Sequence, residues 1–304
     1  MFNLKENEIM PIACLGITVL DRIQRVNELP TKGGKFVANE YFEVGGGPAA
    51  TAAVAVAKLG KEVDFIGRVG GDSVADTMLK ELTSYGVNIG NVIRIENASS
   101  AFSAVLVDDS GERMIINYQD KLLNRDIEPL KSVDFSTYST LLCDVRWPEG
   151  AKYALQQAKL HHVPSVLDAD LSPDPIDELV QLADHVVFSE PGLEKYTNNS
   201  DPIEGLKIAQ KRTESKVYVT VGSKGCYWLE EGDLKHQAGK KVHVVDTTGA
   251  GDVFHGAFAV AVCEQMAARE SIIFSNTVAA VKCTKLGGRE GIPNRDTVNA
   301  EIKN

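Results

Sequence analysis

A regular alternation of strand-like and helix-like segments between residues 140 and 221 most constrains how this chain can fold. The strand-like segments are short apolar runs, and the segments between them carry apolar side chains at helical spacing. In order, these segments cover residues 140–145, 151–160, 163–167, 176–183, 185–188, 203–211 and 216–221. Strands that alternate with helices predict an α/β domain whose mainly parallel sheet is covered on both faces.

Two strand-like segments nearer the N-terminus do not follow this alternation and predict a second, smaller sheet. Residues 101–107 and 113–118 flank the sequence Asp-Asp-Ser-Gly-Glu, in which Asp and Gly supply the geometry of a hairpin turn. We therefore predict a β-sheet lid, with strands within 22–44 and 101–118, on a single domain that spans residues 1–304.

The charge and the cysteine content narrow the class of protein. The chain carries a formal net charge of -10 and no cluster of Lys and Arg, which argues against a nucleic-acid partner. No segment approaches the roughly 20 apolar residues of a membrane span, so no membrane partner is expected. The five cysteines include no Cys-x-x-Cys pair and are typical of reduced thiols. We expect a cytoplasmic enzyme that must build a local cationic pocket for any anionic ligand.

The sequence Asp-Thr-Thr-Gly-Ala-Gly-Asp at residues 246–252 predicts an anion-binding turn. Alternating residues precede it and a helix-like segment follows at 253–265, so the turn is expected between a strand and a helix. Gly249 and Gly251 lack Cβ atoms, which lets backbone N–H groups converge on a ligand at the positive end of a helix. Asp252 is then either a helix cap or a general base beside a phosphoryl group.

Two other glycine-rich turns are candidate binding loops. The sequence Thr-Val-Gly-Ser-Lys-Gly-Cys at 220–226 indicates either a loop that binds the phosphates of a nucleotide, with Lys224 nearby, or a plain hairpin turn. The Gly-Gly-Gly sequence at 45–47 precedes a helix-like segment, but a dinucleotide fingerprint would place a glycine where Ala50 stands. We favour close approach of this backbone to a small polar substrate.

These motifs together resemble the ribokinase family of sugar kinases, also called the PfkB family. The resemblance covers nearly the whole chain and rests on GGPAATAAVAVAKLG near the start and DTTGAGDVFHG near the end, of which the second is highly specific. It implies a three-layer ribokinase-like α/β domain with a β-sheet lid. It also implies phosphorylation of a sugar hydroxyl with ATP as the phosphoryl donor and Mg²⁺ as the metal.

The resemblance assigns roles to residues of the sugar and phosphoryl sites. Asp252 matches the catalytic base, and Gly249, Ala250 and Gly251 match the anion hole. The matching residues on the sugar side are Asp21 as a hydroxyl acceptor, Gly46 and Gly47 as a glycine pair, and Thr51 where the family usually has Asn.

The resemblance also assigns nucleotide and cation sites. The nucleotide residues are Thr220, Gly222, Gly225 and, near the adenine, Asn276. The family's Asn-x-x-Glu element for Mg²⁺ is degraded in FSEPGLEKY, where Glu190 is the candidate that would act through water. Asp246 and Thr248 match a loop that binds a monovalent cation such as K⁺ in some members.

A closer similarity, to kinases of 6-deoxy-6-sulfofructose in sulfoglycolysis, rests on segments such as ACLGITVLDRI, DVRWPEGAK and FSEPGL. It implies transfer to the 1-hydroxyl of the sugar. The sulfonate is a permanent anion, and Arg146, Asn117 and Lys35 are the candidates to bind it. Each also has a structural interpretation, as an ion pair, a hairpin-end polar residue and an exposed lid lysine.

Other functions remain open from residue chemistry alone. Fructose 6-phosphate or another ketose phosphate shares the shape and sign of the sulfonated sugar, so a sugar phosphate is the alternative substrate. A nucleoside kinase and a non-catalytic sugar-binding regulator are more remote alternatives. The open edge of the lid sheet further predicts a homodimer joined through the lids.

Overall fold

The computed structural model describes residues 10–123 and 125–303. Within them, the main sheet has nine strands in the order β13-β12-β11-β10-β9-β8-β1-β4-β5. The strands are β1 (Ile12–Gly16), β4 (Val63–Gly70), β5 (Ile93–Ile95), β8 (Thr140–Asp144), β9 (Ser165–Ala169), β10 (His185–Ser189), β11 (Lys216–Thr220), β12 (Cys226–Glu230) and β13 (Asp233–Gln237). The pairs from β11 to β5 are parallel, and β12 and β13 add an antiparallel edge. The predicted α/β fold with a mainly parallel sheet is therefore confirmed.

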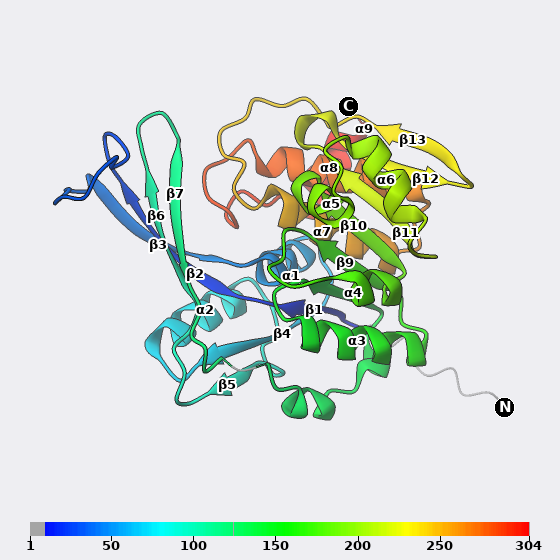
Figure 1. Ribbon diagram of the computed structural model, residues 1–304, viewed down its shortest axis with the longest axis horizontal. Coiled ribbons are helices and arrows are strands. Elements are labelled where there is room, and N and C mark those ends of the chain that lie inside the picture. The colour runs from blue at the N-terminus through cyan, green and yellow to red at the C-terminus, as the bar shows by residue number, and fades with distance from the viewer. Residues whose placement is uncertain (1–9, 124, 304) are drawn as a thin grey trace.

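Helices cover both faces of this sheet (Figure 1). They are α1 (Pro48–Lys58), α2 (Ser73–Ser84), α3 (Pro148–His161), α4 (Asp177–Leu182), α5 (Glu190–Thr197), α6 (Pro202–Gln210), α7 (Ala250–Cys263), α8 (Ala268–Lys282) and α9 (Arg295–Lys303). Strand β1 shows the layering, because Ile12 and Cys14 contribute to the core with α1, α7 and α8, whereas Ala13 and Leu15 contribute to the core with α3 and α6. Alternate side chains of a central strand thus enter two different cores.

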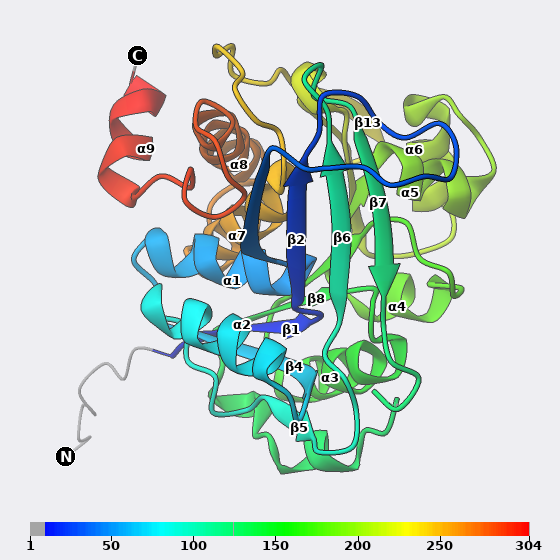
Figure 2. The same cartoon turned by 90° about the vertical axis from the view of Figure 1, so that its left-hand side faces the viewer.

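A second sheet of four strands, in the order β3-β2-β6-β7, stands beside the main domain as the predicted lid. Its strands are β2 (Val19–Arg25), β3 (Glu40–Gly46), β6 (Phe102–Val107) and β7 (Arg113–Tyr118). Figure 2 shows β2, β6 and β7 running side by side. The lid connects to the main sheet through β1, which leads into β2, and through β3, which leads into α1.

Three local expectations from the sequence were wrong. The apolar run at residues 11–19 predicts one buried strand with Asp21 just past its end. Instead, β1 ends at Gly16 and β2 begins at Val19, so Asp21 lies inside a lid strand. The alternating residues 36–44 predict a lid strand with Lys35 at its start. Strand β3 begins only at Glu40, which leaves Lys35 in the preceding loop. The residues just before Asp246 form no strand in the described structure, although they alternate in sequence.

Helices α1 and α7, which follow the two glycine motifs of the family, lie against each other. A Cβ atom on Gly256 would approach the carbonyl oxygen of Ala52 to 2.5 Å, so the two backbones come too close for any larger residue. This contact brings the beginnings of both helices together. The methyl Cγ2 of Thr51 would lie 3.5 Å from a Cβ on Gly249.

Candidate active site

The Gly-Ala-Gly turn forms the beginning of α7. Gly249 is the N-cap residue with φ at 72°, a left-handed conformation that favours glycine, and the helix starts at Ala250. A Cβ on Gly251 would meet nothing within 4 Å, so open space lies in front of this helix turn. Because Gly249 holds the cap position, Asp252 stands in the first turn of the helix, as a base beside an anion site would.

Asp252 lies in an acidic environment that favours its protonated form. Burial raises the pKa of Asp252 from 3.8 to about 7, and the carboxylates of Asp168, Asp170 and Asp144 add to the rise. The nearby His255 opposes it. A carboxyl with a pKa close to neutrality is well suited to accept a proton from a hydroxyl group.

His255 and Asp168 form a buried pair behind this carboxyl. His255 Nδ1 lies 2.8 Å from Asp168 Oδ2, and both side chains are about 95% buried or more. Although burial alone would lower the pKa of His255, the adjacent Asp168 raises it above its ordinary value. His255 follows Asp252 by three residues on α7, so the pair supports the face of the helix that carries the candidate base.

Asp144, at the end of β8, ties three elements of the site together. Its carboxylate accepts hydrogen bonds from the backbone N–H groups of Ile17 at 2.8 Å, Ala49 at 3.1 Å and Arg146 at 2.8 Å. A Cβ on Gly16 would lie 2.1 Å from this carboxylate, so only glycine fits there. Asp144 thus fixes the turn into the lid, the start of α1 and the backbone of Arg146. This role could not be predicted from the sequence, in which Asp144 is only an Asp at the end of a strand.

Three polar residues form a row across the lid sheet. Asp21 of β2 is paired in register with Ser103 of β6, and Ser103 is paired with Asn117 of β7. Directly opposed residues point to the same face of a sheet, so two predicted sugar contacts lie on one face with Ser103 between them. Ser103 Oγ donates to Asn117 Oδ1 at 2.9 Å. Burial raises the pKa of Asp21, and a Cβ on Gly46 would lie 2.4 Å from its Oδ2.

Arg289 supports the glycine pair through a hydrogen bond to the backbone of Gly46. Its Nη2 donates to the carbonyl oxygen of Gly46 at 2.8 Å, and its Nε reaches Thr51 Oγ1 at 3.4 Å. Its Nη1 lies 3.3 Å from Glu81 Oε2, while only 2% of its side chain is exposed. Thr51 therefore contacts a buried guanidinium. The GGRE turn that carries Arg289 lies far along the chain, and nothing in the sequence linked it to the glycine pair.

Arg146 lies just beyond the end of β8, at the carboxyl edge of the sheet, where open α/β sheets bind ligands. Its Nη2 lies 3.4 Å from Asp170 Oδ2. Lys35 is exposed in the loop between β2 and β3. The strand register thus groups Asp21 with Asn117 on one face of the lid.

The candidate nucleotide residues converge on one segment. Gly222–Lys224 forms a single 3-10 turn between β11 and β12, and Thr220 is the last residue of β11. A Cβ on Gly225 would lie 2.1 Å from the carbonyl oxygen of Gln237. Asn276 Nδ2 donates to the carbonyl oxygens of Gln237 and Ala238, each at 3.4 Å. The predicted adenine residue and the glycine turn therefore border the same stretch of chain.

The cation candidates differ in how well they fit a metal. Among the described residues, no group of three or more His, Cys, Asp or Glu side chains could hold a metal ion. Mg²⁺ keeps several waters and binds substrate phosphates, so the single exposed Glu190 at the start of α5 fits a contact through water.

Asp246 fits a potassium ion poorly. Its Oδ1 accepts hydrogen bonds from Thr248 N at 2.9 Å, from Thr248 Oγ1 at 2.7 Å and from Arg113 of the lid at 3.1 Å. Its Oδ2 accepts from Gly287 N at 3.0 Å, and the buried ammonium of Lys282 donates to its carbonyl oxygen at 3.0 Å. Protein donors therefore use the oxygens that a cation would need.

Comparison with known proteins identifies the family. The sequence pattern of the family described as "pfkB family carbohydrate kinase" matches residues 11–295. A ribokinase of Schizosaccharomyces pombe is 30% identical over 93% of this chain and 94% of its own length. A deoxyribokinase of Salmonella typhimurium is 27% identical over 95% of this chain and 98% of its own length. The structure of Arabidopsis thaliana ribokinase complexed with ribose and ATP superposes with a TM-score of 0.87, at 25% identity, over 97% of this chain and 99% of that one.

The chain therefore belongs to the pfkB family of carbohydrate kinases. It is an ATP-dependent sugar kinase with the ribokinase fold, a phosphotransferase that acts on an alcohol group. These relatives are named for ribose and deoxyribose and not for a sulfonated sugar. No helix in the described part of the chain is long and apolar enough to cross a membrane.

Proposed function

We propose that this kinase phosphorylates the 1-hydroxyl of 6-deoxy-6-sulfofructose. The observation that carries the proposal is the guanidinium of Arg146 at the carboxyl edge of the sheet, because a cation there can bind an anionic group of the sugar. Arginine presents a planar fork of donors that matches the oxygens of a sulfonate. Asn117 adds a polar group on the lid face that carries Asp21.

In the proposed reaction, Asp21 accepts hydrogen bonds from sugar hydroxyls. Asp252 takes the proton of the 1-hydroxyl as this oxygen attacks the γ-phosphorus of ATP, and ADP leaves. Backbone N–H groups of Gly249, Ala250 and Gly251 hold the transferring phosphoryl group at the positive end of α7. Bound Mg²⁺ would neutralise charge on the phosphates of ATP, with Glu190 as its candidate contact through water.

A direct assay compares ADP release with Mg-ATP and equal concentrations of sulfofructose, fructose 6-phosphate, fructose, ribose and deoxyribose. We expect sulfofructose to give the highest kcat/KM by at least about tenfold, the usual value of one charged hydrogen bond. A clear preference for ribose would refute the proposal and agree with the names of the relatives. A preference for fructose 6-phosphate would retain the anion pocket and reject the sulfonate.

Substitution of Arg146 tests the pocket itself. Arg146→Met should raise KM for sulfofructose much more than KM for ATP. The matched control is Arg125→Met, because Arg125 also pairs with carboxylates, Glu149 and Asp174, but is half exposed. An equal change in both KM values for Arg146→Met, or the same effect in the control, would contradict the assignment.

The lid also supports the predicted homodimer, with a second copy of this chain as the partner. Tyr41, Met114, Ile116 and Tyr118 are exposed and, by strand register, lie on the face of the lid opposite to Asp21. An exposed apolar face of a sheet is typical of an interaction site. Light scattering should give twice the monomer mass, and Ile116→Glu should reduce it. A monomer at all concentrations would refute the dimer.

A further inference from the structure

Asp170 is the carboxylate placed beside Arg146 by the parallel pairing of β8 and β9. Asp144 is in register with Asp168, and Arg146 and Asp170 each follow two residues later, beyond the ends of their strands. Arg146 Nη2 and Asp170 Oδ2 are 3.4 Å apart, with about a third of each side chain exposed. The pairing is therefore built into the register and not a chance contact of two flexible side chains.

Asp170 is also held from its other side. Its Oδ1 accepts a hydrogen bond from Ser189 Oγ at 2.6 Å, and Ser189 in turn accepts one from the N–H of Gly192 at the start of α5. Because Ser189 at the start of α5 binds Oδ1, Oδ2 of Asp170 faces the guanidinium of Arg146. The negative charge thus has a defined position next to the candidate anion-binding group.

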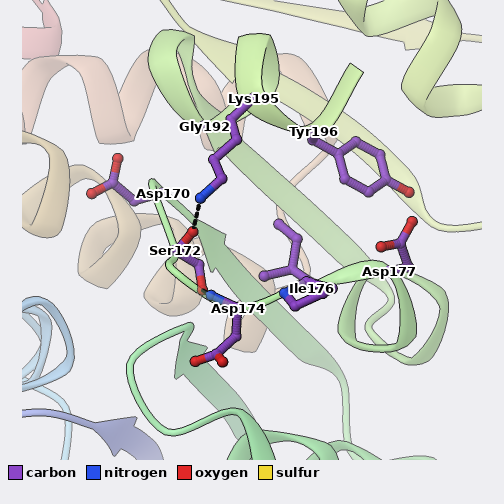
Figure 3. A pocket seen from close by; sticks show the side chains of 9 residues that line it. Asp170, Ser172, Asp174, Ile176, Asp177, Gly192, Lys195 and Tyr196 are labelled. Carbon is purple, nitrogen blue, oxygen red and sulfur yellow. Dashed lines mark hydrogen bonds between the residues drawn. The ribbon is translucent and has the colours of Figure 1, made fainter. Parts of the chain in front are cut away.

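The surroundings of Asp170 show that its charge is not already neutralised by a lysine. Figure 3 shows Asp170 at one end of a cavity of about 120 Å³ that Lys195 also lines. The ammonium of Lys195 is turned to the carbonyl oxygen of Ser172. Arg146 is therefore the cation that an ion pair assigns to Asp170 in the described structure.

We infer that Asp170 sets which anionic sugar the kinase accepts, by offsetting part of the charge of Arg146. A guanidinium paired with a carboxylate suits a sulfonate, which carries one negative charge. It disfavours a phosphate, which carries up to about two negative charges at pH 7. Asp170 is thus a residue that determines specificity without being part of the phosphoryl-transfer chemistry. This inference rests on the proposed binding of an anionic sugar at Arg146.

Coulomb's law gives the size of the effect. At about 6 Å in a partly hydrated site, the repulsion between Asp170 and one additional negative charge corresponds to about a threefold to tenfold change in affinity. Asp170→Asn keeps the shape of the side chain and an oxygen to accept from Ser189, but removes the charge. The variant should therefore raise kcat/KM for fructose 6-phosphate relative to sulfofructose by about threefold to tenfold.

The experiment measures the ratio of kcat/KM for fructose 6-phosphate to that for sulfofructose, at pH 5.5 and pH 7.5. Comparing this ratio between the variant and the parent protein at the same pH cancels the titration of groups that both proteins share. The shared charged groups around Asp170 are Arg146, Lys195, Asp144, Asp168, Asp174, Asp177, Asp252 and His255. The second charge of the phosphate appears near pH 6, so the ratio should rise with pH more steeply in Asp170→Asn than in the parent protein.

Asp174→Asn is the matched control. Asp174 lines the same cavity but pairs with Arg125 at 2.7 Å, so its substitution should leave the substrate ratio within about twofold of the parent value. An unchanged ratio in Asp170→Asn would overturn the inference, and so would equal losses for both substrates, which would indicate a structural or metal-binding role. If the parent protein phosphorylates neither anionic sugar, the proposed function itself fails. Turnover by the parent therefore tests the function, and the change in ratio tests Asp170.

Discussion

Replacement of Asp252 by Asn should stabilise the protein at alkaline pH and remove most of its turnover. Burial, together with nearby carboxylates, raises the pKa of Asp252 from 3.8 to about 7. The folded protein therefore favours the protonated carboxyl. The stability that this raised pKa contributes is present below about pH 4 and is lost as the pH rises through the folded value of about 7. The ionised base that catalysis requires is thus the destabilising form.

The magnitude follows from the pKa. A rise of about three units corresponds to about 4 kcal/mol of unfolding free energy if nothing screens it. Asp252 is partly exposed, so water reduces the effect, and we expect about 2 kcal/mol at pH 8. For a chain of this size, about 2 kcal/mol corresponds to a change in Tm of about 3 °C. Asn has nearly the same shape as Asp and carries no charge, so the variant avoids this cost.

The assay compares the Tm of Asp252→Asn and the parent protein without ligands. The variant should melt about 3 °C higher at pH 8 and within about 1 °C of the parent at pH 4.5. Turnover should fall at least about a hundredfold, the usual contribution of a general base. Asp233→Asn, at an exposed carboxylate of β13, is the control and should show no such dependence on pH. A Tm difference that is the same at both pH values would refute the electrostatic reasoning, and near-normal turnover would refute the role as base.

Three further predictions concern neighbouring parts of the site. His255 lowers the pKa of Asp252, so His255→Asn should move the acidic limb of the kcat/KM profile up by as much as about one pH unit; a downward shift would contradict the placement of the pair. Gly225→Ala would put a Cβ 2.1 Å from Gln237 O and should raise KM for ATP about tenfold while KM for the sugar changes little; equal increases would argue against the nucleotide loop. Arg289→Met should lower the unfolding free energy by about 3 kcal/mol and raise KM for the sugar more than KM for ATP, as measured by denaturant unfolding and initial rates; an unchanged sugar KM would limit Arg289 to a structural role.

The fold class and the family follow from local patterns in the sequence. The alternation of apolar strands with amphipathic helices requires a sheet covered on both faces, because a parallel strand can bury both its faces only between helices. Gly249 takes a left-handed conformation at the start of α7 that favours glycine, and such a local requirement can be recognised in the sequence. The hairpin of the lid was predicted for the same reason, since Asp and Gly specify its turn.

Which distant residues meet is settled by the packing of the whole chain. The row of Asp21, Ser103 and Asn117 depends on the register of three strands, and register is set by packing and hydrogen bonding across the sheet. Arg289 reaches Gly46 across more than 240 positions of the chain, a contact that no local pattern encodes. The pair of Arg146 and Asp170 likewise exists because two parallel strands end side by side. A glycine turn or a helix start can be predicted from one segment of the sequence. The pairing of charged side chains from different segments, such as Arg146 and Asp170, is decided only when the chain folds.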